Sequence, residues 1–184
     1  MKNPTRQVSS HYLAIPVVGR DHLQGPIGAP LTLIEYGDYE CPYCGDVYLV
    51  VRAIQEELGN KLCFSFRNFP LNQMHPHAEH AAEAAEAAGA QEKFWEMHDV
   101  LFENQDRLGD DDLAGYALEL ALDARRLASE IRAGAHAGRV REDFRMGVRG
   151  GVNGTPTFFV NGRRYAGPLS AEGLLGALVH HPAE

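Results

Sequence analysis

The pattern of apolar residues changes abruptly at the Cys-Pro-Tyr-Cys sequence of residues 41–44, and this change limits the folds open to the chain. Residues 31–36, LTLIEY, are apolar almost throughout, as is typical of a strand covered on both faces. After the cysteines, apolar residues recur at helical spacing up to Gly59. Residues 61–69, KLCFSFRNF, again have strand character. The sequence therefore predicts a βαβ unit with the cysteine pair where the first strand meets the helix.

The rest of the chain separates into a helical interval and a second strand-containing segment. No strand pattern interrupts residues 75–149. Strand character returns in TFFV at residues 157–160, and the Asn-Gly pair at residues 161–162 is typical of a hairpin turn. Ser170 is a suitable N-cap for a last helix, SAEGLLGALV.

This order of elements predicts an α/β protein in which one sheet domain is interrupted by a helical subdomain. A chain of 184 residues can bury most of its apolar surface without disulfides or metals. We assign residues 1–24 to an N-terminal extension and 25–73 to the first half of the sheet domain. Residues 74–149 form the inserted subdomain, and 150–184 the second half.

Composition argues against several function classes. The formal net charge is -8, with 17 basic and 25 acidic residues, so we expect no nucleic-acid partner. No apolar run reaches the length of a membrane span. Residues 1–19 do not have the pattern of a signal peptide, which predicts a cytoplasmic location, or a periplasmic or exported one if a leader was removed ahead of Met1.

The close cysteine pair has three possible purposes: half of a zinc site, a structural clip, or a redox pair. A clip is disfavoured because the loop between Cys41 and Cys44 is so short that closing it removes little unfolded-state entropy. A zinc site needs two more ligands, for which His75, His77 and His80 are the candidates. A solvated loop and helix start explains these histidines more simply.

A redox pair needs a stabilised thiolate, and the predicted position of Cys41 provides one. Pro42 falls at the first helical position, where a missing N–H has no consequence. Free N–H groups and the helix dipole then favour negative charge on Cys41, so that it becomes the attacking sulfur. Cys44, one turn inside the helix, can resolve a mixed disulfide. Cys63 lies in an apolar run and is expected in the core.

LTLIEYGDYECPYCG, a helical middle containing QEKFWEMHDVLFENQ, and GVNGTPTFFVNG together resemble the DsbA-like branch of the thioredoxin superfamily. The likeness runs from about Gly25 onward. It implies a thioredoxin fold with a helical insertion and a thiol-disulfide oxidoreductase that uses a redox-active disulfide between Cys41 and Cys44. We expect no cofactor and no metal.

The resemblance also assigns supporting residues. Cys41 matches the solvent-exposed nucleophile, and Pro156 matches a cis proline that packs against the disulfide. A cis turn there would hold the Thr155 backbone beside the sulfurs, where an extended substrate can pair with it. Glu35 matches a buried acid that could exchange a proton with Cys44. Alternatively, Glu35 could be a strand-end carboxylate paired with Arg67.

The sequence departs from the DsbA type between the cysteines, where Tyr43 replaces histidine. Cys-Pro-Tyr-Cys is found in many glutaredoxins, so the motif leaves the direction of electron flow open. Tyr43 is expected on the exposed turn, where it could touch substrate, while part of the set Tyr36, Tyr39 and Tyr43 packs the strand.

The first functional hypothesis is therefore disulfide exchange with protein or peptide thiols and disulfides, with a further, unidentified redox partner. One alternative is a glutathione-linked enzyme that resembles glutaredoxins or the kappa glutathione transferases. Another is a metal-binding module that uses the cysteine pair and the nearby histidines. His98 is expected to be a packing residue, and the carboxylates Glu79, Glu83 and Glu86 a solvated stripe on one helix face.

Overall fold

The computed structural model describes residues 19–180. None of the helices in this part combines the length and apolar character needed to cross a membrane. In chain order the elements are β1 (His22–Gln24), β2 (Leu31–Gly37), α1 (Pro42–Leu58), the short 3-10 helix η1 (Gly59–Lys61), β3 (Leu62–Asn68), α2 (Ala78–Gly89), α3 (Phe94–Glu103), α4 (Asp110–Glu119), α5 (Ala124–Arg132), α6 (Ala137–Arg149), β4 (Thr157–Val160), β5 (Arg163–Arg164) and α7 (Ala171–His180).

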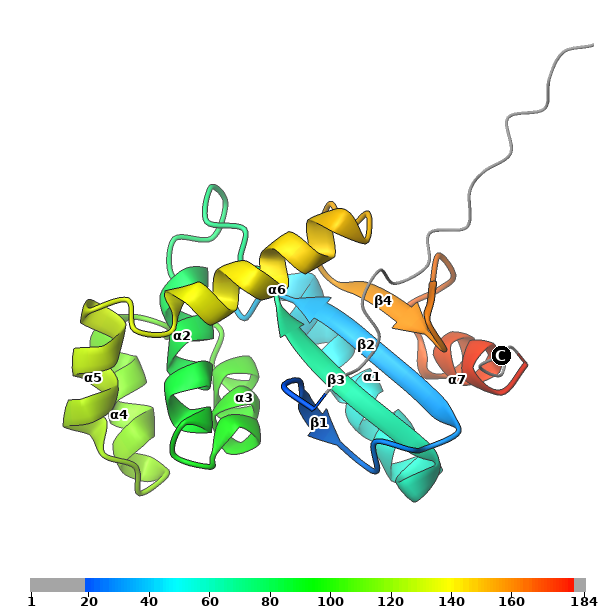
Figure 1. The fold of residues 1–184 in the computed structure, drawn as a ribbon, viewed down its shortest axis with the longest axis horizontal. Coiled ribbons are helices and arrows are strands. Elements are labelled where there is room, and N and C mark those ends of the chain that lie inside the picture. Colours follow the sequence, from blue (N-terminus) through cyan, green and yellow to red (C-terminus); the bar gives the residue numbers. More distant parts are fainter. Residues whose placement is uncertain (1–18, 181–184) are drawn as a thin grey trace, which may run out of the picture.

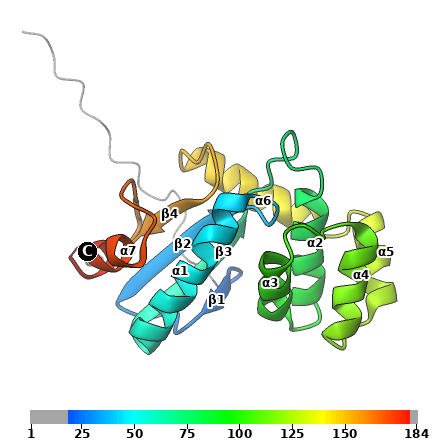
Figure 2. The same cartoon turned by 180° about the vertical axis from the view of Figure 1, so that it is seen from behind.

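The strands form one five-stranded sheet in the order β1-β3-β2-β4-β5. Strands β2 and β3 are parallel, and every other neighbouring pair is antiparallel. Helices α1 and α7 lie on one face and α6 crosses the other, while α2 to α5 gather beside the sheet (Figures 1 and 2). The predicted α/β architecture with a helical interval is confirmed.

Strand β1 was not predicted. It lies within the segment of residues 1–24 that the sequence analysis assigned to an extension, and it pairs antiparallel with β3. Its three residues are too few to show a period-2 pattern. The part of that segment before residue 19 lies outside the described residues.

Strand β2 is covered on both faces, as its apolar sequence predicted. Leu33 belongs to the main core, which α1, α7 and the helical group share. Ile34 and Tyr36 point to the other face, where they pack with Phe69 and Phe159. Alternate residues of β2 therefore pack in two separate apolar clusters on opposite faces of the sheet. This alternation decides which side chains of β2 can approach the cysteines.

The expectation of a solvated acidic stripe on α2 is wrong for two of its three members. Glu83 and Glu86 are buried, and only Glu79 is partly exposed. The cause is the alanine content of α2, since its small side chains let α3, α5 and α6 all pack against it. Glu86 instead accepts a hydrogen bond of 2.8 Å from the Asn68 side chain at the end of β3.

The C-terminal hairpin and helix have the local geometry that their sequences indicated. Asn161 and Gly162 both have positive φ, 49° and 78°, as a two-residue hairpin turn of the mirror-image type requires. The Ser170 hydroxyl accepts a hydrogen bond from Gly173 N at 3.2 Å and so caps α7.

Candidate active site

Helix α1 begins directly at the cysteine pair. Cys41 is its N-cap residue, with an extended backbone, and Pro42 is the first helical residue. The Cys41 carbonyl accepts hydrogen bonds from Cys44 N at 3.0 Å and Gly45 N at 3.2 Å. Proline suits this position because no helical partner exists for an N–H there. Both cysteines are free thiols in the structure.

The two thiols differ in their access to the surface. Cys44 is fully buried, while Cys41 lines an open groove. The expectation that Cys41 is solvent-exposed is corrected, because only 4% of its surface is accessible. The Thr155 carbonyl lies 3.5 Å from the Cys41 sulfur and covers part of it.

The environment also separates the acidities of the two thiols. A hydrogen bond from the Cys44 thiol outweighs the effect of burial, and Thr155 and the N–H groups of Cys44 and Tyr43 add to it. Together they lower the pKa of Cys41 to about 5. Burial, the hydrogen bond with Cys41, and the charges of Glu35 and Cys41 raise the pKa of Cys44 well above its ordinary value. The site therefore holds one thiolate and one thiol near neutral pH.

Thr155 and Pro156 come from the opposite end of the sequence and complete the site. The Thr155–Pro156 peptide bond is cis, as the resemblance implied. The Thr157 hydroxyl donates a hydrogen bond of 2.7 Å to Gly154 O and so closes this turn at the start of β4. The fold therefore brings residues more than a hundred positions apart to the same sulfur.

Glu35 lies on β2, on the face that also carries Leu33 and packs against α1. It is buried, and its Oε1 has no hydrogen-bond partner within residues 19–180. Burial and the charge of Cys41 raise the pKa of this carboxyl to about 8. Glu35 in turn raises the pKa of Cys44. The carboxyl and the two thiols are thus electrostatically coupled.

The alternative pairing of Glu35 with Arg67 is excluded by the register of the sheet. Glu35 is level with Phe66 on the parallel neighbour β3, while Arg67 is level with Tyr36. Successive residues of a strand point to opposite faces, so Glu35 and Arg67 are on different sides of the sheet. Arg67 instead forms a buried ion pair of 2.7 Å with Asp21.

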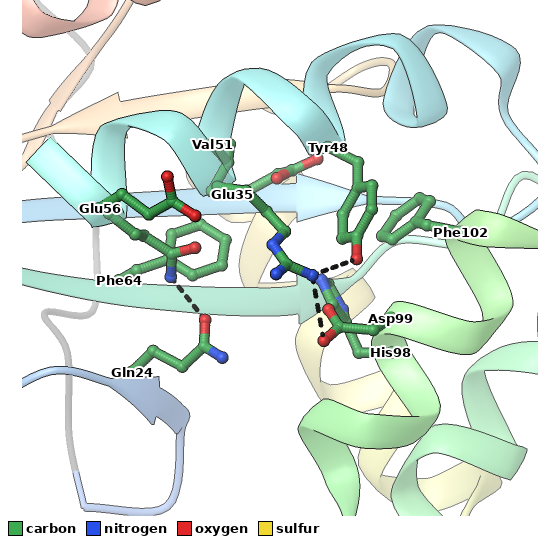
Figure 3. Close-up of a pocket in the computed structure, with 11 residues that line it drawn as sticks. Gln24, Glu35, Tyr48, Val51, Glu56, Phe64, His98, Asp99 and Phe102 are labelled. Atoms are coloured by element: carbon green, nitrogen blue, oxygen red, sulfur yellow. Dashed lines mark hydrogen bonds and ion pairs between the residues drawn. The ribbon is translucent and has the colours of Figure 1, made fainter.

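Glu35 borders a cavity of about 370 Å³ between β2, α1 and α3. Figure 3 shows its carboxyl near the Tyr48 ring, with Glu56 on one side and Asp99 on the other. Arg52 spans part of the cavity, bonding to the Tyr48 hydroxyl at 3.0 Å and to Asp99 at 3.5 Å. The cavity joins an otherwise enclosed carboxyl to polar side chains at the surface.

Gln105 is a residue of the site that the sequence analysis missed. From the segment after α3, its side-chain amide donates to Tyr39 O at 2.8 Å and to Cys41 O at 2.9 Å. A Cβ on Gly45 would meet the same amide at 2.0 Å, so glycine after the motif makes room for it. In the sequence, the sign of this contact is Gly45, the glycine that follows the motif.

Two residues that the sequence placed in the core are buried as expected. Cys63 is buried on β3, and His98 is buried among aromatic rings, where its Nδ1 lies 3.1 Å from the Tyr39 hydroxyl. Burial, helped by the charges of His22 and Arg52, lowers the pKa of His98 to about 3. His98 is therefore a neutral packing residue.

The groove beside Cys41 has a volume of about 800 Å³ and is mainly apolar. Tyr43 and Met74 project into solvent there, with 68% and 67% of their surfaces accessible. Leu71 and Phe144 form part of its wall. Contiguous apolar surface of this kind, unlike a single exposed apolar side chain, marks a candidate binding surface.

The three histidines proposed for a metal site each contact a different carboxylate. His75 Nδ1 lies 2.8 Å from Asp38, His77 Nδ1 3.0 Å from Glu40, and His80 Nδ1 2.6 Å from Asp110. No group of three or more potential ligands within residues 19–180 is arranged to hold a metal ion. This geometry gives the metal hypothesis no support.

Comparison with known proteins identifies the family. Residues 18–179 match the family model described as Thioredoxin. A Na(+)/H(+) antiporter NhaA 1 from Salinispora arenicola is 47% identical over 90% of this chain, and an NhaA antiporter from Herminiimonas arsenicoxydans is 39% identical over 86%. The chain spans only about a quarter of the length of these relatives.

Solved structures give the closer comparison of fold. BdbD from Bacillus subtilis has a TM-score of 0.79 at 23% identity, with 87% of this chain and 91% of that chain covered. Wolbachia pipientis alpha-DsbA1 has a TM-score of 0.77 at 21% identity, with 94% and 95% covered. The chain therefore belongs to the thioredoxin family and has the fold of its DsbA-like thiol-disulfide oxidoreductases.

Proposed function

We propose that this protein exchanges disulfides with protein or peptide substrates through Cys41 and Cys44. The observation that carries the proposal is the opposed acidity of the two thiols. A pKa of about 5 keeps Cys41 as a thiolate near neutral pH, while the raised pKa of Cys44 keeps it protonated until it is needed. A purely structural pair would have no use for this difference.

In the reductive direction, the Cys41 thiolate attacks one sulfur of a substrate disulfide and expels the other as a thiolate. Cys44 then loses its proton and attacks Cys41 in the mixed disulfide, which releases the second substrate sulfur as a thiolate. Two electrons pass from the protein to the substrate, and Cys41 and Cys44 are left as a disulfide. The same steps in reverse oxidise a substrate dithiol.

Glu35 is the proposed proton carrier for Cys44. Its raised pKa of about 8 lets it release and regain a proton near neutral pH. The cavity at Glu35 provides the exit for that proton toward Arg52 and Asp99. Thr155 and Pro156 are the proposed substrate-pairing turn beside the reacting sulfur.

The groove favours an extended polypeptide over a small thiol as the substrate. Its apolar wall and the exposed Tyr43 and Met74 suit a peptide with apolar side chains next to its cysteine. The transferase form of the glutathione-linked alternative has less support, because a buried resolving Cys44 has no task in transferase chemistry, while the glutaredoxin-like form stays an alternative.

The similarity to part of the NhaA proteins favours a more specific partner. We propose that a Na(+)/H(+) antiporter, or a protein beside it in the membrane, is among the substrates of this module. The DsbA-like solved structures lend no support to the expected cytoplasmic location.

Replacement of single cysteines should separate attack from resolution. Cys41→Ser should abolish the reduction of insulin, followed as turbidity, because the stabilised thiolate is lost. Cys44→Ser should still attack and should accumulate a mixed disulfide visible on non-reducing gels. Cys63→Ala is the control with near-normal activity, and activity in Cys41→Ser equal to that of the wild type would contradict the proposal.

Glu35→Gln should slow the release of substrate from the mixed disulfide by about 100-fold or more, since a positioned acid or base typically contributes about 10²- to 10⁴-fold. Single-turnover kinetics measure this step. Initial attack by Cys41 should change much less. Equal losses in both steps would argue against a specific role in resolution.

The same variant should alter the pH dependence of stability in the reduced protein. The pKa of Glu35 rises from 4.5 to about 8 on folding, so the folded chain holds a proton that the unfolded chain releases. The Glu35 contribution to stability should therefore fall as pH rises across this interval, by roughly 1 kcal/mol per pH unit, whereas Cys41, whose pKa falls to about 5 on folding, contributes in the opposite direction. Denaturant unfolding at several pH values should show this fall as a decreasing difference in unfolding free energy between the wild type and Glu35→Gln, and Glu56→Gln, an exposed control, should show the same difference from Glu35→Gln as the wild type does.

The reduction potential of the pair should lie between those of thioredoxin and DsbA, at about -270 and -120 mV. The reason is that the Cys41 pKa of about 5 lies between about 7 and 3.5 for the corresponding thiols. Equilibration with glutathione buffers measures it. A value below that of thioredoxin would contradict the assigned stabilisation of the dithiol form.

Cys44→Ser should also capture the membrane partner. Incubated with membranes that contain an NhaA antiporter, the variant should form a disulfide-linked adduct that reductant dissolves and mass spectrometry identifies. Cys41→Ser is the matched control and should capture nothing. Adducts that contain only unrelated proteins would refute the antiporter proposal while leaving disulfide exchange intact.

A further inference from the structure

His75 lies in the loop between β3 and α2 and lines the same groove as Cys41 and Thr155. A tight turn holds it there, because Met74 N and His75 N both donate to Leu71 O, at 2.8 and 3.0 Å. The imidazole is mostly buried, with 15% of the side chain accessible. A histidine from outside the Cys-x-x-Cys sequence thus faces the groove at the reacting sulfur.

Asp38 fixes His75 and the cysteine turn in one network. Its fully buried carboxylate accepts from His75 Nδ1 at 2.8 Å and from Leu71 N at 2.8 Å. The same carboxylate accepts from Glu40 N at 2.8 Å, and the Asp38 carbonyl accepts from Cys41 N at 3.1 Å. The position of the imidazole relative to Cys41 is therefore set by a shared anchor rather than by a flexible loop.

The charges around the imidazole favour its cationic form. Burial lowers the pKa of His75, but the hydrogen bond and charge of Asp38, with the charges of Cys41 and Glu40, outweigh burial and raise it above 6.5. Charge interactions are reciprocal, so a cation at His75 stabilises the Cys41 thiolate.

Other charged groups also border this part of the groove. Glu79 on α2 and Arg141 on α6 line the groove. His77 contacts Glu40 and is half exposed. Tyr43, the residue between the motif cysteines that projects over the groove, carries no positive charge to offer.

We propose that His75 is a positioning residue that supplies the cation beside the Cys41 thiolate, held in place by Asp38. The inference rests on the proposed disulfide exchange and names the group that tunes it. His75 lowers the Cys41 pKa by less than the Cys44 thiol and the helix N–H groups do, since these dominate the acidity of Cys41. Loss of His75 should therefore weaken, and not abolish, the reaction.

The decisive measurement is the pH titration of the Cys41 thiolate by its ultraviolet absorbance in the reduced protein. His75→Asn removes the charge but keeps an amide donor for Asp38, and it should raise the Cys41 pKa by about 0.5 to 1 unit. His77→Asn, which removes another histidine of the same loop, should shift it by less than about 0.2. His75→Lys should restore most of the wild-type value.

An unchanged Cys41 pKa in a folded His75→Asn protein would overturn the proposal. If the His75→Asn protein still reduces insulin, the proposed disulfide exchange stands without the role proposed for His75. A wild-type protein that does not reduce insulin would refute the proposed function itself.

A second measurement on the intact chain covers the case in which His75→Asn fails to fold. The His75 ring resonances, titrated by NMR, should give a higher pKa in the reduced protein than in the disulfide form, where Cys41 carries no charge. Equal values in the two forms would likewise overturn the proposal.

Discussion

The site depends on the way β2 passes into α1 at residues 38–44. Strand β2 ends at Gly37, the Asp38 carbonyl accepts a hydrogen bond from Cys41 N, and Pro42 starts the helix, so that Cys41 occupies the N-cap. Unpaired N–H groups at the start of a helix stabilise negative charge without any charged side chain. Residues far away in the chain then act on this one junction: Thr155 covers the sulfur, Gln105 holds the two carbonyls of the turn, and Leu71 N donates to the Asp38 carboxylate.

The local elements could be predicted from sequence because they depend on period and on a few special residues. The helix after the cysteines, the Asn-Gly hairpin and the Ser170 cap all follow from short-range chemistry. The expectation of a thiolate at Cys41 needed only the position of the cysteine relative to strand and helix. By contrast, the three-residue strand β1 has no readable period, and its pairing with β3 is a tertiary event.

The errors concern side chains whose surroundings come from other parts of the chain. Glu83 and Glu86 have the spacing of a solvated helix face, but the alanines around them allow helices to pack on nearly every side. Whether Glu35 could pair with Arg67 depended on the register of β2 and β3, which the sequence does not state and which puts the two on opposite faces. Gln105 carries no motif at all, and its contacts exist only because the helical insertion returns to the cysteine turn.

The two thiols, Glu35 and His75 are best understood as one coupled titrating system. Negative charge on Cys41 raises the pKa of Glu35 and Cys44, which lie beneath it, and also that of His75 in the groove. When Cys41 enters a disulfide, that charge disappears. Glu35 and Cys44 then become easier to ionise at the moment when Cys44 must lose its proton. The proton is thus held in the resting dithiol and released in the mixed disulfide, and the switch between the two states is the covalent chemistry of Cys41 itself.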